Sequence, residues 1–330
     1  MQRILLIGDS SGRPDEGMKR IAQELGDLLG SNNGMAVARA SVSEVLRNPG
    51  AFGKIDLVHY MAGPSWRSFL YASLLRRFLG CNPKTIIFFI HPTWSRLASM
   101  CLRAFKPDAA IVQSEKWARY CSRFDIVVSD ELQAGVDLKK FRQVSEEQRR
   151  RIRDRIGLPA DKKILLHIGH LNVRRNVLAL AEFTNDADIL PVVVGSTTVR
   201  ASGRIVSALQ RAGAKVIREY LENVEEFYQA ADCYVFPTVD PHGCVQIPLS
   251  VLEALACGVP VVTTRFEGLP HYLPEGFPGL TYVDNPAAIR QGVQRVLCSG
   301  VRPDPAKLQK FSWDSIARNT GDLYRRILAT

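Results

Sequence analysis

The segment at residues 234–264 is predicted to form a strand, a loop, a helix and a second strand, and its residue types suit a phosphate ligand. Its sequence is YVFPTVDPHGCVQIPLSVLEALACGVPVVTT. Pro248 fits the first turn of the helix, because an N–H group there has no intrahelical acceptor, and Gly258 ends the helix. The amino terminus of such a helix offers free amides and partial positive charge, a favourable seat for a diphosphate. Glu253 lies further along the helix, placed either to accept the hydroxyls of a ribose or simply to face solvent.

Two histidines and two glycines lie at or just after apolar strand segments, where ligands bind in parallel α/β sheets. His91 follows the buried run TIIFFI and is a candidate catalytic residue, with capping of the strand end as the alternative. His59, within DLVHYMAG, is a weaker candidate. Gly8 and Gly12, in the loop GDSSGRPDEG, would let the backbone approach a phosphate or sugar closely, although glycines after strands are more often only turns.

These candidate residues lie at the ends of strands only if the chain forms parallel sheets. Apolar runs rich in Ile and Val do alternate with helical segments along the chain, as such sheets require. Each half of the chain carries six such runs, so we expect an α/β fold of two doubly wound, Rossmann-like domains. The predicted strands are 3–7, 36–38, 57–61, 85–90, 109–112 and 126–128 in the first half, and 164–169, 190–194, 215–217, 233–236, 259–263 and 280–282 in the second.

The segment at residues 143–158 has no strand character and ends in Gly157 and Leu158, so it is predicted to join two domains. A chain of 330 residues is long enough for two cores of roughly 150 residues each. We expect one domain at 1–157, a second at 158–310, and a last helical segment at 311–330.

Charge is divided unevenly between these halves. Residues 1–157 hold 25 Lys and Arg against 16 Asp and Glu, a net +9, whereas residues 158–330 hold 18 against 17, a net +1. A basic half favours a phosphorylated substrate, nucleic acid or an anionic membrane surface, with simple solubility as the alternative. The seven cysteines are odd in number and never spaced C-x-x-C, which argues against a disulfide framework and a zinc site. With no apolar stretch long enough to span a bilayer and no secretory signal, a cytoplasmic protein is expected.

Six motifs in register resemble the retaining glycosyltransferases of the GT-B class, specifically glycosyltransferase family 4. LEALACGVPVVTT is similar to that family's helix-and-strand signature, and QAGVDLKKF to the segment that closes its first domain. The others are LHIGHLNVRRN, REYLENVEEFYQAADCYVFPT, EGLPHYL and FSWDSIARNTGDLYRRIL. The resemblance covers residues 133–330 and implies two Rossmann-like domains facing across a cleft, transfer from a nucleotide sugar with retention, and no bound metal. It also implies that 1–157 is the acceptor-side domain, that 158–310 is the nucleotide-sugar donor domain, and that the helix at 311–330 crosses back to the first domain.

The resemblance also implies the site residues. His170 matches the arginine and Arg175 the lysine with which the family neutralises the leaving diphosphate, and His91 matches a histidine beside the donor sugar. Val245 stands where the family usually has a glutamate that holds the donor sugar, so recognition of the sugar must differ here. The remaining donor-site residues implied are Tyr220, His242, Gly243, Cys244, Gln246, Ile247, Pro248, Ser250 and Glu253.

The partners expected are a nucleotide sugar and a glycan or lipid-linked acceptor, with no cofactor or metal and no nucleic acid. Residues 65–80, SWRSFLYASLLRRFLG, are predicted to form a helix with an apolar face beside arginines. This helix lies either in the interface of an anionic membrane, which we favour, or in the core of the first domain. Two other functions stay open: a non-catalytic binding protein of GT-B fold, and a sugar epimerase or phosphorylase of the same architecture.

Overall fold

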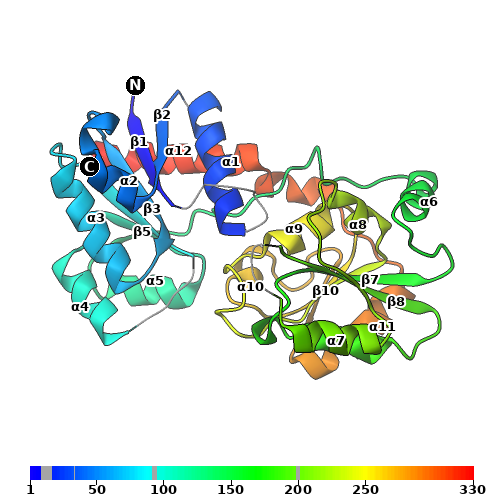
Figure 1. Ribbon diagram of the computed structural model, residues 1–330. Helices are drawn as coiled ribbons and strands as arrows, with labels where there is room; N and C mark the ends of the chain where they lie inside the picture. Colours follow the sequence, from blue (N-terminus) through cyan, green and yellow to red (C-terminus); the bar gives the residue numbers. More distant parts are fainter. Residues whose placement is uncertain (9–16, 33, 91–94, 198–200) are drawn as a thin grey trace. The chain divides into compact units, whose positions relative to one another are not determined.

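A computed structural model describes residues 1–8, 17–32, 34–90, 95–197 and 201–330 (Figure 1). Contacts divide the chain into two compact units. Unit 1 consists of Met1–Gly135, Val245–Ile247 and Trp313–Thr330, and unit 2 of Val136–Cys244 and Pro248–Ser312. The domain boundary at residue 157 stays a prediction about which segments fold independently, and limited proteolysis would test it.

Unit 1 contains a six-stranded parallel sheet in the order β2-β1-β3-β4-β5-β6. Such a sheet is covered by helices on both faces, so its strands are apolar throughout. The strands are β1 (Arg3–Ile7), β2 (Ala36–Ala40), β3 (Leu57–Gly63), β4 (Lys84–Phe89), β5 (Ala109–Ile111) and β6 (Val127–Ser129).

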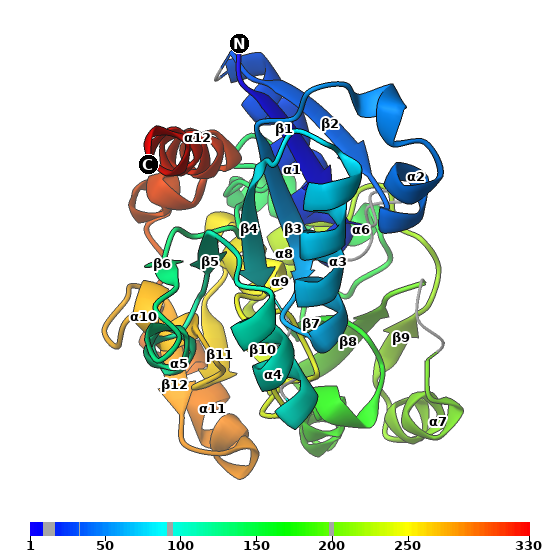
Figure 2. The same cartoon turned by 90° about the vertical axis from the view of Figure 1, so that its left-hand side faces the viewer.

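Helices cover both faces of this sheet (Figures 1 and 2). One face packs in a single apolar core against α2 (Val42–Arg47), α3 (Trp66–Phe78), α4 (Arg96–Ala104) and α5 (Glu115–Ser122). The opposite face carries α1 (Gly17–Asn32) and α12 (Trp313–Ala329), which contact each other. The 3-10 turn Pro49–Phe52 precedes β3.

Unit 2 contains a second six-stranded parallel sheet, in the order β12-β11-β10-β7-β8-β9. Its strands are β7 (Lys163–Gly169), β8 (Ile189–Gly195), β9 (Lys215–Ile217), β10 (Cys233–Phe236), β11 (Val261–Thr264) and β12 (Leu280–Val283). Its helices are α6 (Glu146–Arg155), α7 (Gly203–Arg211), α8 (Glu225–Ala230), α9 (Leu249–Ala256), α10 (Leu269–Tyr272) and α11 (Ile289–Ser299). The 3-10 segments are Val173–Arg175, Val177–Phe183, Pro286–Ala288 and Pro305–Phe311.

All twelve predicted strands are confirmed, with ends shifted by at most two residues. The prediction of two doubly wound α/β sheets is also confirmed.

The membrane-interface prediction for residues 65–80 is wrong for the apolar face of that helix. Phe69, Ala72 and Leu75 of α3 are buried in the core of unit 1, because they pack against the sheet. The core alternative therefore holds for α3. Among the helices within the described ranges, none is long and apolar enough to cross a bilayer.

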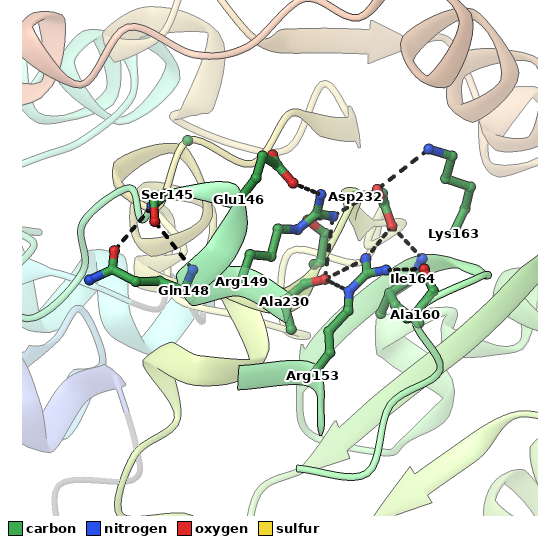
Figure 3. A network of polar contacts seen from close by, with 12 residues as sticks. Ser145, Glu146, Gln148, Arg149, Arg153, Ala160, Lys163, Ile164, Ala230 and Asp232 are labelled. Carbon is green, nitrogen blue, oxygen red and sulfur yellow. Dashed lines mark hydrogen bonds and ion pairs between the residues drawn. The ribbon is translucent and has the colours of Figure 1, made fainter. Parts of the chain in front are cut away.

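A buried polar network fixes α6 to the amino ends of β7 and β10 (Figure 3). The carboxylate of Asp232 accepts hydrogen bonds of 2.7 Å from Arg149 Nη2, Arg153 Nη2 and the backbone N–H of Ile164. The Arg153 side chain also donates to the carbonyl oxygen of Ala230. Each charged side chain of this network has an ion-pair partner, because Glu146 also lies 3.5 Å from Arg149, although Arg149 Nε is buried without a hydrogen bond. The network thereby orients α6.

Candidate functional site

The sheet of unit 2 reverses its strand order between β7 and β10, which are paired neighbours. From β7 the chain moves outward through β8 to β9, and from β10 through β11 to β12. In open parallel sheets, ligands bind at such a reversal, beyond the carboxyl ends of the strands. The loop after β7 contains Arg175 and the helix after β10 contains Glu253, so the topology brings both to this edge.

Arg175 is a buried cation for which the described residues supply no carboxylate partner. Its side chain is 7% exposed, its Nε has no hydrogen-bond partner, and no ion pair joins it to an Asp or Glu in the described ranges. The guanidinium carbon lies 5.7 Å from the centroid of the Phe236 ring, a cation–π arrangement. Because a buried charge without a counter-ion is costly, this site favours an anionic ligand.

Gly169, the last residue of β7, makes room for this guanidinium. Its φ of +153° is a conformation that side chains rarely adopt, and a Cβ there would lie 3.2 Å from Arg175 Nη1 and 3.6 Å from His167 Nε2. A glycine is therefore required at position 169, because the Arg175 guanidinium packs against it and leaves no space for a side chain.

His167 lies beneath the same guanidinium as a neutral imidazole. Its Nδ1 is 2.9 Å from the carbonyl oxygen of Val235, which identifies Nδ1 as the protonated nitrogen, and its ring stacks on Tyr234 and Phe236. Burial, the largest cause, and the charge of Arg175 together lower the pKa of His167 to about 4, although the hydrogen bond to Val235 acts in the opposite direction. Arg175 therefore carries the positive charge of this pair at neutral pH.

The first turn of α9 lies against the same residues. Pro248 is the N-cap residue and provides no side-chain capping bond, so the first amides of α9 are not capped from the side chain of that residue. Ser250, in the first turn, is hydrogen-bonded to Tyr234, whose hydroxyl donates to the carbonyl oxygen of Ile168 at 3.1 Å. The charge of Arg175 also acts on Tyr234. One tyrosine thus joins the end of β7, Arg175 and the start of α9.

Glu253 is buried, which excludes the alternative of a solvent-facing helix carboxylate. It is 6% exposed, and its Oε2 accepts a 2.8 Å hydrogen bond from the hydroxyl of Tyr228. Burial, and then the charge of Glu253, hold the pKa of Tyr228 well above its ordinary value, so the tyrosine donates at every physiological pH. The Tyr228 ring lies 5.6 Å from that of Tyr234. The structure therefore brings Arg175, Ser250 and Glu253 together through two tyrosines.

The loop after β10 packs tightly on the loop after β7. Gly243 has no space for a side chain, because a Cβ would lie 2.9 Å from the carbonyl oxygen of Arg174 and 3.0 Å from that of Asp240. Arg174 is exposed and its Nε lies 3.7 Å from the Asp240 carboxylate. The backbone N–H of His242 donates to the same carboxylate at 2.8 Å, and its side chain is exposed.

Cys244 and the three residues that follow it are buried, although contacts assign Val245–Ile247 to unit 1. Val245 is 8% exposed, and Ile247 is completely buried. Within unit 1, the Gln246 side chain donates a 2.7 Å hydrogen bond to the carbonyl oxygen of Phe89 at the end of β4.

The other predicted residues are placed as follows. His170 directly follows β7 and is half-buried, and Tyr220 lies between β9 and α8, 42% exposed. Gly8 directly follows β1, where its N–H donates to the carbonyl oxygen of Ala40 and a Cβ would lie 3.2 Å from that of Met61. His91 and Gly12 lie outside the described residues.

His59 is a core residue of unit 1. It is fully buried, its Nδ1 lies 2.6 Å from the hydroxyl of Tyr324 in α12, and burial lowers its pKa to about 3. The weaker catalytic prediction for His59 is therefore wrong, because the side chain faces α12 rather than the carboxyl edge of the sheet.

Three residues of this arrangement escaped the sequence analysis: His167, Tyr228 and Tyr234. His167 and Tyr234 are inside strands, where a polar side chain in an apolar run was the only available signal. Tyr228 lies in the stretch REYLENVEEFYQAAD, whose resemblance to a nucleotide-bracketing segment pointed to the region and not to the residue.

Groups of three or more potential metal-binding side chains do not occur within the described ranges. All seven cysteines are free thiols. Asp186, in the sequence Asp186-Ala187-Asp188, accepts hydrogen bonds from Arg290 Nη2 on both carboxylate oxygens, at 2.8 and 2.9 Å, so this carboxylate is already paired.

Solved structures share the fold. Sucrose-phosphate synthase from Thermosynechococcus elongatus matches with a TM-score of 0.77 at 20% identity, covering 100% of both chains. Anabaena HepE in complex with UDP-glucose matches with a TM-score of 0.72 at 14% identity, covering 99% of this chain and 100% of that one. At these identities the likeness establishes the GT-B-like fold.

Curated relatives match over part of the chain's length. A glycosyltransferase of Methanocaldococcus jannaschii, described as uncharacterized, is 29% identical over 200 residues, which are 55% of this chain and 50% of the relative. The D-inositol 3-phosphate glycosyltransferase of Acidothermus cellulolyticus is 30% identical over 219 residues, 59% of this chain and 47% of the relative. The matched part of the chain thus spans about half the length of these relatives.

Residues 148–311, which contain the whole Arg175–Glu253 arrangement, match the family described as Glycosyl transferases group 1. This is the family that the six sequence motifs resemble. By this match, the chain belongs to the glycosyl transferases group 1 family, glycosyltransferase family 4.

Proposed function

We propose that this chain is a retaining glycosyltransferase that moves a sugar from a nucleotide sugar to a hydroxyl of a glycan or lipid-linked acceptor. The observation that carries the proposal is the buried, carboxylate-free guanidinium of Arg175 beside the first turn of α9. Both groups favour the same ligand, a diphosphate, which would provide the missing negative charge.

In the reaction, the bond between the sugar's anomeric carbon and the diphosphate oxygen breaks, and its electron pair leaves with the diphosphate. The acceptor oxygen forms the new bond to the anomeric carbon, and its proton passes to the departing phosphate oxygen. Negative charge grows on the diphosphate in the transition state, where Arg175 and the amides of α9 would stabilise it. Glu253, oriented by Tyr228, would hold the ribose hydroxyls.

His170, Tyr220 and the loop from His242 to Ile247 are proposed to complete the donor site, and His91, with Gly8 and Gly12, to lie near the sugar. Val245 offers no hydrogen bond to a sugar hydroxyl, so backbone groups or neighbouring side chains must recognise the donor sugar. The HepE structure holds UDP-glucose, which makes it the first donor to test. A panel of UDP, GDP, ADP and CDP sugars in a thermal-shift assay would then identify the base.

Arg175→Ala tests the proposal against Arg174→Ala, a neighbouring exposed arginine. We expect the Arg175 variant to bind the identified donor about 10- to 100-fold more weakly, the effect of losing hydrogen bonds to a charged group, and Arg174→Ala to stay near wild type. The melting temperature without ligand separates the roles: removing an uncompensated buried charge should not lower it.

A lower melting temperature together with unchanged donor affinity would make Arg175 structural, and the proposed diphosphate site would be wrong. Release of nucleotide that requires an acceptor distinguishes transfer from epimerisation, and a protein that binds donor without any turnover would be a binding protein.

A further inference from the structure

Positive charge is concentrated in one stretch of the chain. Seven Lys and Arg residues and no Asp or Glu lie between Asp56 and Asp108. Residues 66–124 hold ten basic residues against two acidic ones, so this segment carries +8 of the chain's net charge of +10. It includes α3, α4 and α5, which cover one face of the sheet of unit 1 (Figure 2).

Helix α4 places apolar and cationic side chains on one outward face. Leu102 is buried against the sheet, whereas Leu97 is 47% and Met100 65% exposed. Helical spacing sets two arginines beside this apolar pair, both of them exposed: Arg96 and Arg103. We call Arg96, Leu97, Met100 and Arg103 the α4 face.

Arg96 is the arginine of the α4 face whose charge no contact in the described ranges explains, because Arg103 lies in the last turn of α4 with its guanidinium carbon 5.5 Å from the centroid of the Phe124 ring. Arg77 and Arg96 are exposed and form no ion pair within the part of the chain that is described, whereas Arg76 is paired with Asp108 at 2.6 Å. Arg96 lies in the first turn of α4, where the helix dipole disfavours a positive charge. Its position is therefore not accounted for by the stability of the helix.

Helix α7 of unit 2 shows that this pattern is not general. It has nine residues, as α4 does, and buries Ile205, Val206 and Leu209. Its outward side chains are all polar: Arg204, Ser207, Gln210 and Arg211. A pair of exposed large apolar side chains thus distinguishes α4 from α7, and α3 also ends in one such side chain, Phe78, which is 52% exposed.

We propose that the α4 face binds an anionic lipid surface, with Leu97 and Met100 entering the interface and the arginines facing lipid phosphates. Charge complementarity favours this occupant, because an anionic bilayer attracts the basic segment and also accepts apolar side chains. A nucleic acid or an acidic protein surface would use the charges and leave the apolar pair unexplained. The inference uses none of the residues proposed for the donor site, of which Arg175 and Glu253 belong to unit 2 and His91, Gly8 and Gly12 fall in the sequence range of unit 1.

Co-sedimentation with vesicles tests the proposal, using vesicles of phosphatidylcholine alone and with an equal part of phosphatidylglycerol. We expect wild-type protein to bind the anionic vesicles at low ionic strength, to be released at high ionic strength, and to ignore the neutral vesicles. Donor binding, measured separately by thermal shift, shows that each variant is folded and distinguishes failure of this proposal from failure of the proposed function.

Three double variants divide the contributions. Arg96→Gln with Arg103→Gln should weaken vesicle binding about 25-fold, since each basic residue near an anionic leaflet contributes about fivefold. Leu97→Gln with Met100→Gln should weaken it about 10-fold by removing apolar contact. Arg204→Gln with Arg211→Gln on α7 removes the same charge elsewhere and should bind like wild type.

The proposal is overturned if wild-type protein does not bind anionic vesicles at low ionic strength, or if the α7 variant loses as much affinity as the charge variant on α4. Equal binding of the Leu97→Gln/Met100→Gln variant and wild type would also overturn it. Retention on heparin would then identify a soluble polyanion or acidic partner as the occupant.

Discussion

Asp232→Asn is expected to be among the most destabilising single changes in unit 2. Asp232 is 8% exposed and accepts from two arginines and one backbone N–H, so the isosteric amide removes the charge that compensates Arg149 and Arg153. Breaking one side of a buried ion pair costs about 3–5 kcal/mol, which is a large part of the total stability of a domain. For a unit of this size the melting temperature should fall by roughly 10 °C.

Tryptophan fluorescence can distinguish the unfolding of unit 1 from that of unit 2. All four fall in the sequence ranges of unit 1: Trp66, Trp94, Trp117 and Trp313. In urea unfolding, Asp232→Asn should shift the part of the far-UV circular dichroism transition that tryptophan fluorescence does not report. Glu147→Gln is the matched control, because it breaks the exposed Arg151–Glu147 pair on the same helix and should change little.

The loss of stability caused by Asp232→Asn is expected to become smaller as the pH falls. Burial alone would raise the pKa of Asp232, but Arg149, Ile164 N–H and Arg153 together hold it below its ordinary value of 3.8. A depressed carboxyl pKa contributes stability above the unfolded-state value, and the contribution is lost as pH falls through the folded-state value. The difference between wild type and Asp232→Asn should therefore vanish in acid. An effect no larger than that of Glu147→Gln at neutral pH would refute the argument.

Three further predictions concern the site, the histidines and metal. Glu253→Gln should weaken nucleotide binding by about 1.5–3 kcal/mol, and Tyr228→Phe by less, in calorimetric titrations; unchanged affinity of the glutamate variant would remove the ribose role. The pKa values of His59 and His167 are about 3 and about 4, so ring NMR signals from both should stay those of neutral imidazole at pH 5. Because the unfolded chain protonates first, each should cost about 2 kcal/mol of stability as pH falls from 6.5 to 5; titration near 6.5 would show that they are not buried. Transfer should survive excess EDTA, since the described residues bring no three metal-binding side chains together; loss of transfer that a divalent ion restores would contradict this.

The fold could be predicted from the sequence because both sheets are parallel and buried on both faces. Their strands are continuous apolar runs bounded by polar loops, and this signal is local. The reversal between β7 and β10 could be anticipated only through motif resemblance, since strand order depends on contacts between distant segments.

Side-chain environments were less predictable, because they depend on partners far along the chain. His59 looks like a residue near a strand end, but its partner Tyr324 is 265 residues away. The sequence is equally compatible with a solvent-facing Glu253, because its hydrogen-bond partner, Tyr228, lies in another helix. Helical periodicity in α3 revealed an apolar face and could not tell whether lipid or the sheet covers that face.

The split composition of unit 1 has a consequence for biosynthesis. Its strands come from the first 135 residues, but α12, which covers one face of that sheet, comes from Trp313–Thr330. On the ribosome, the segments of unit 2 emerge before α12, so unit 2 has all its segments while unit 1 still exposes the side chain of His59. Until α12 has emerged, that histidine has no Tyr324 to bond, and the amino-terminal sheet exposes a face to which chaperones can bind.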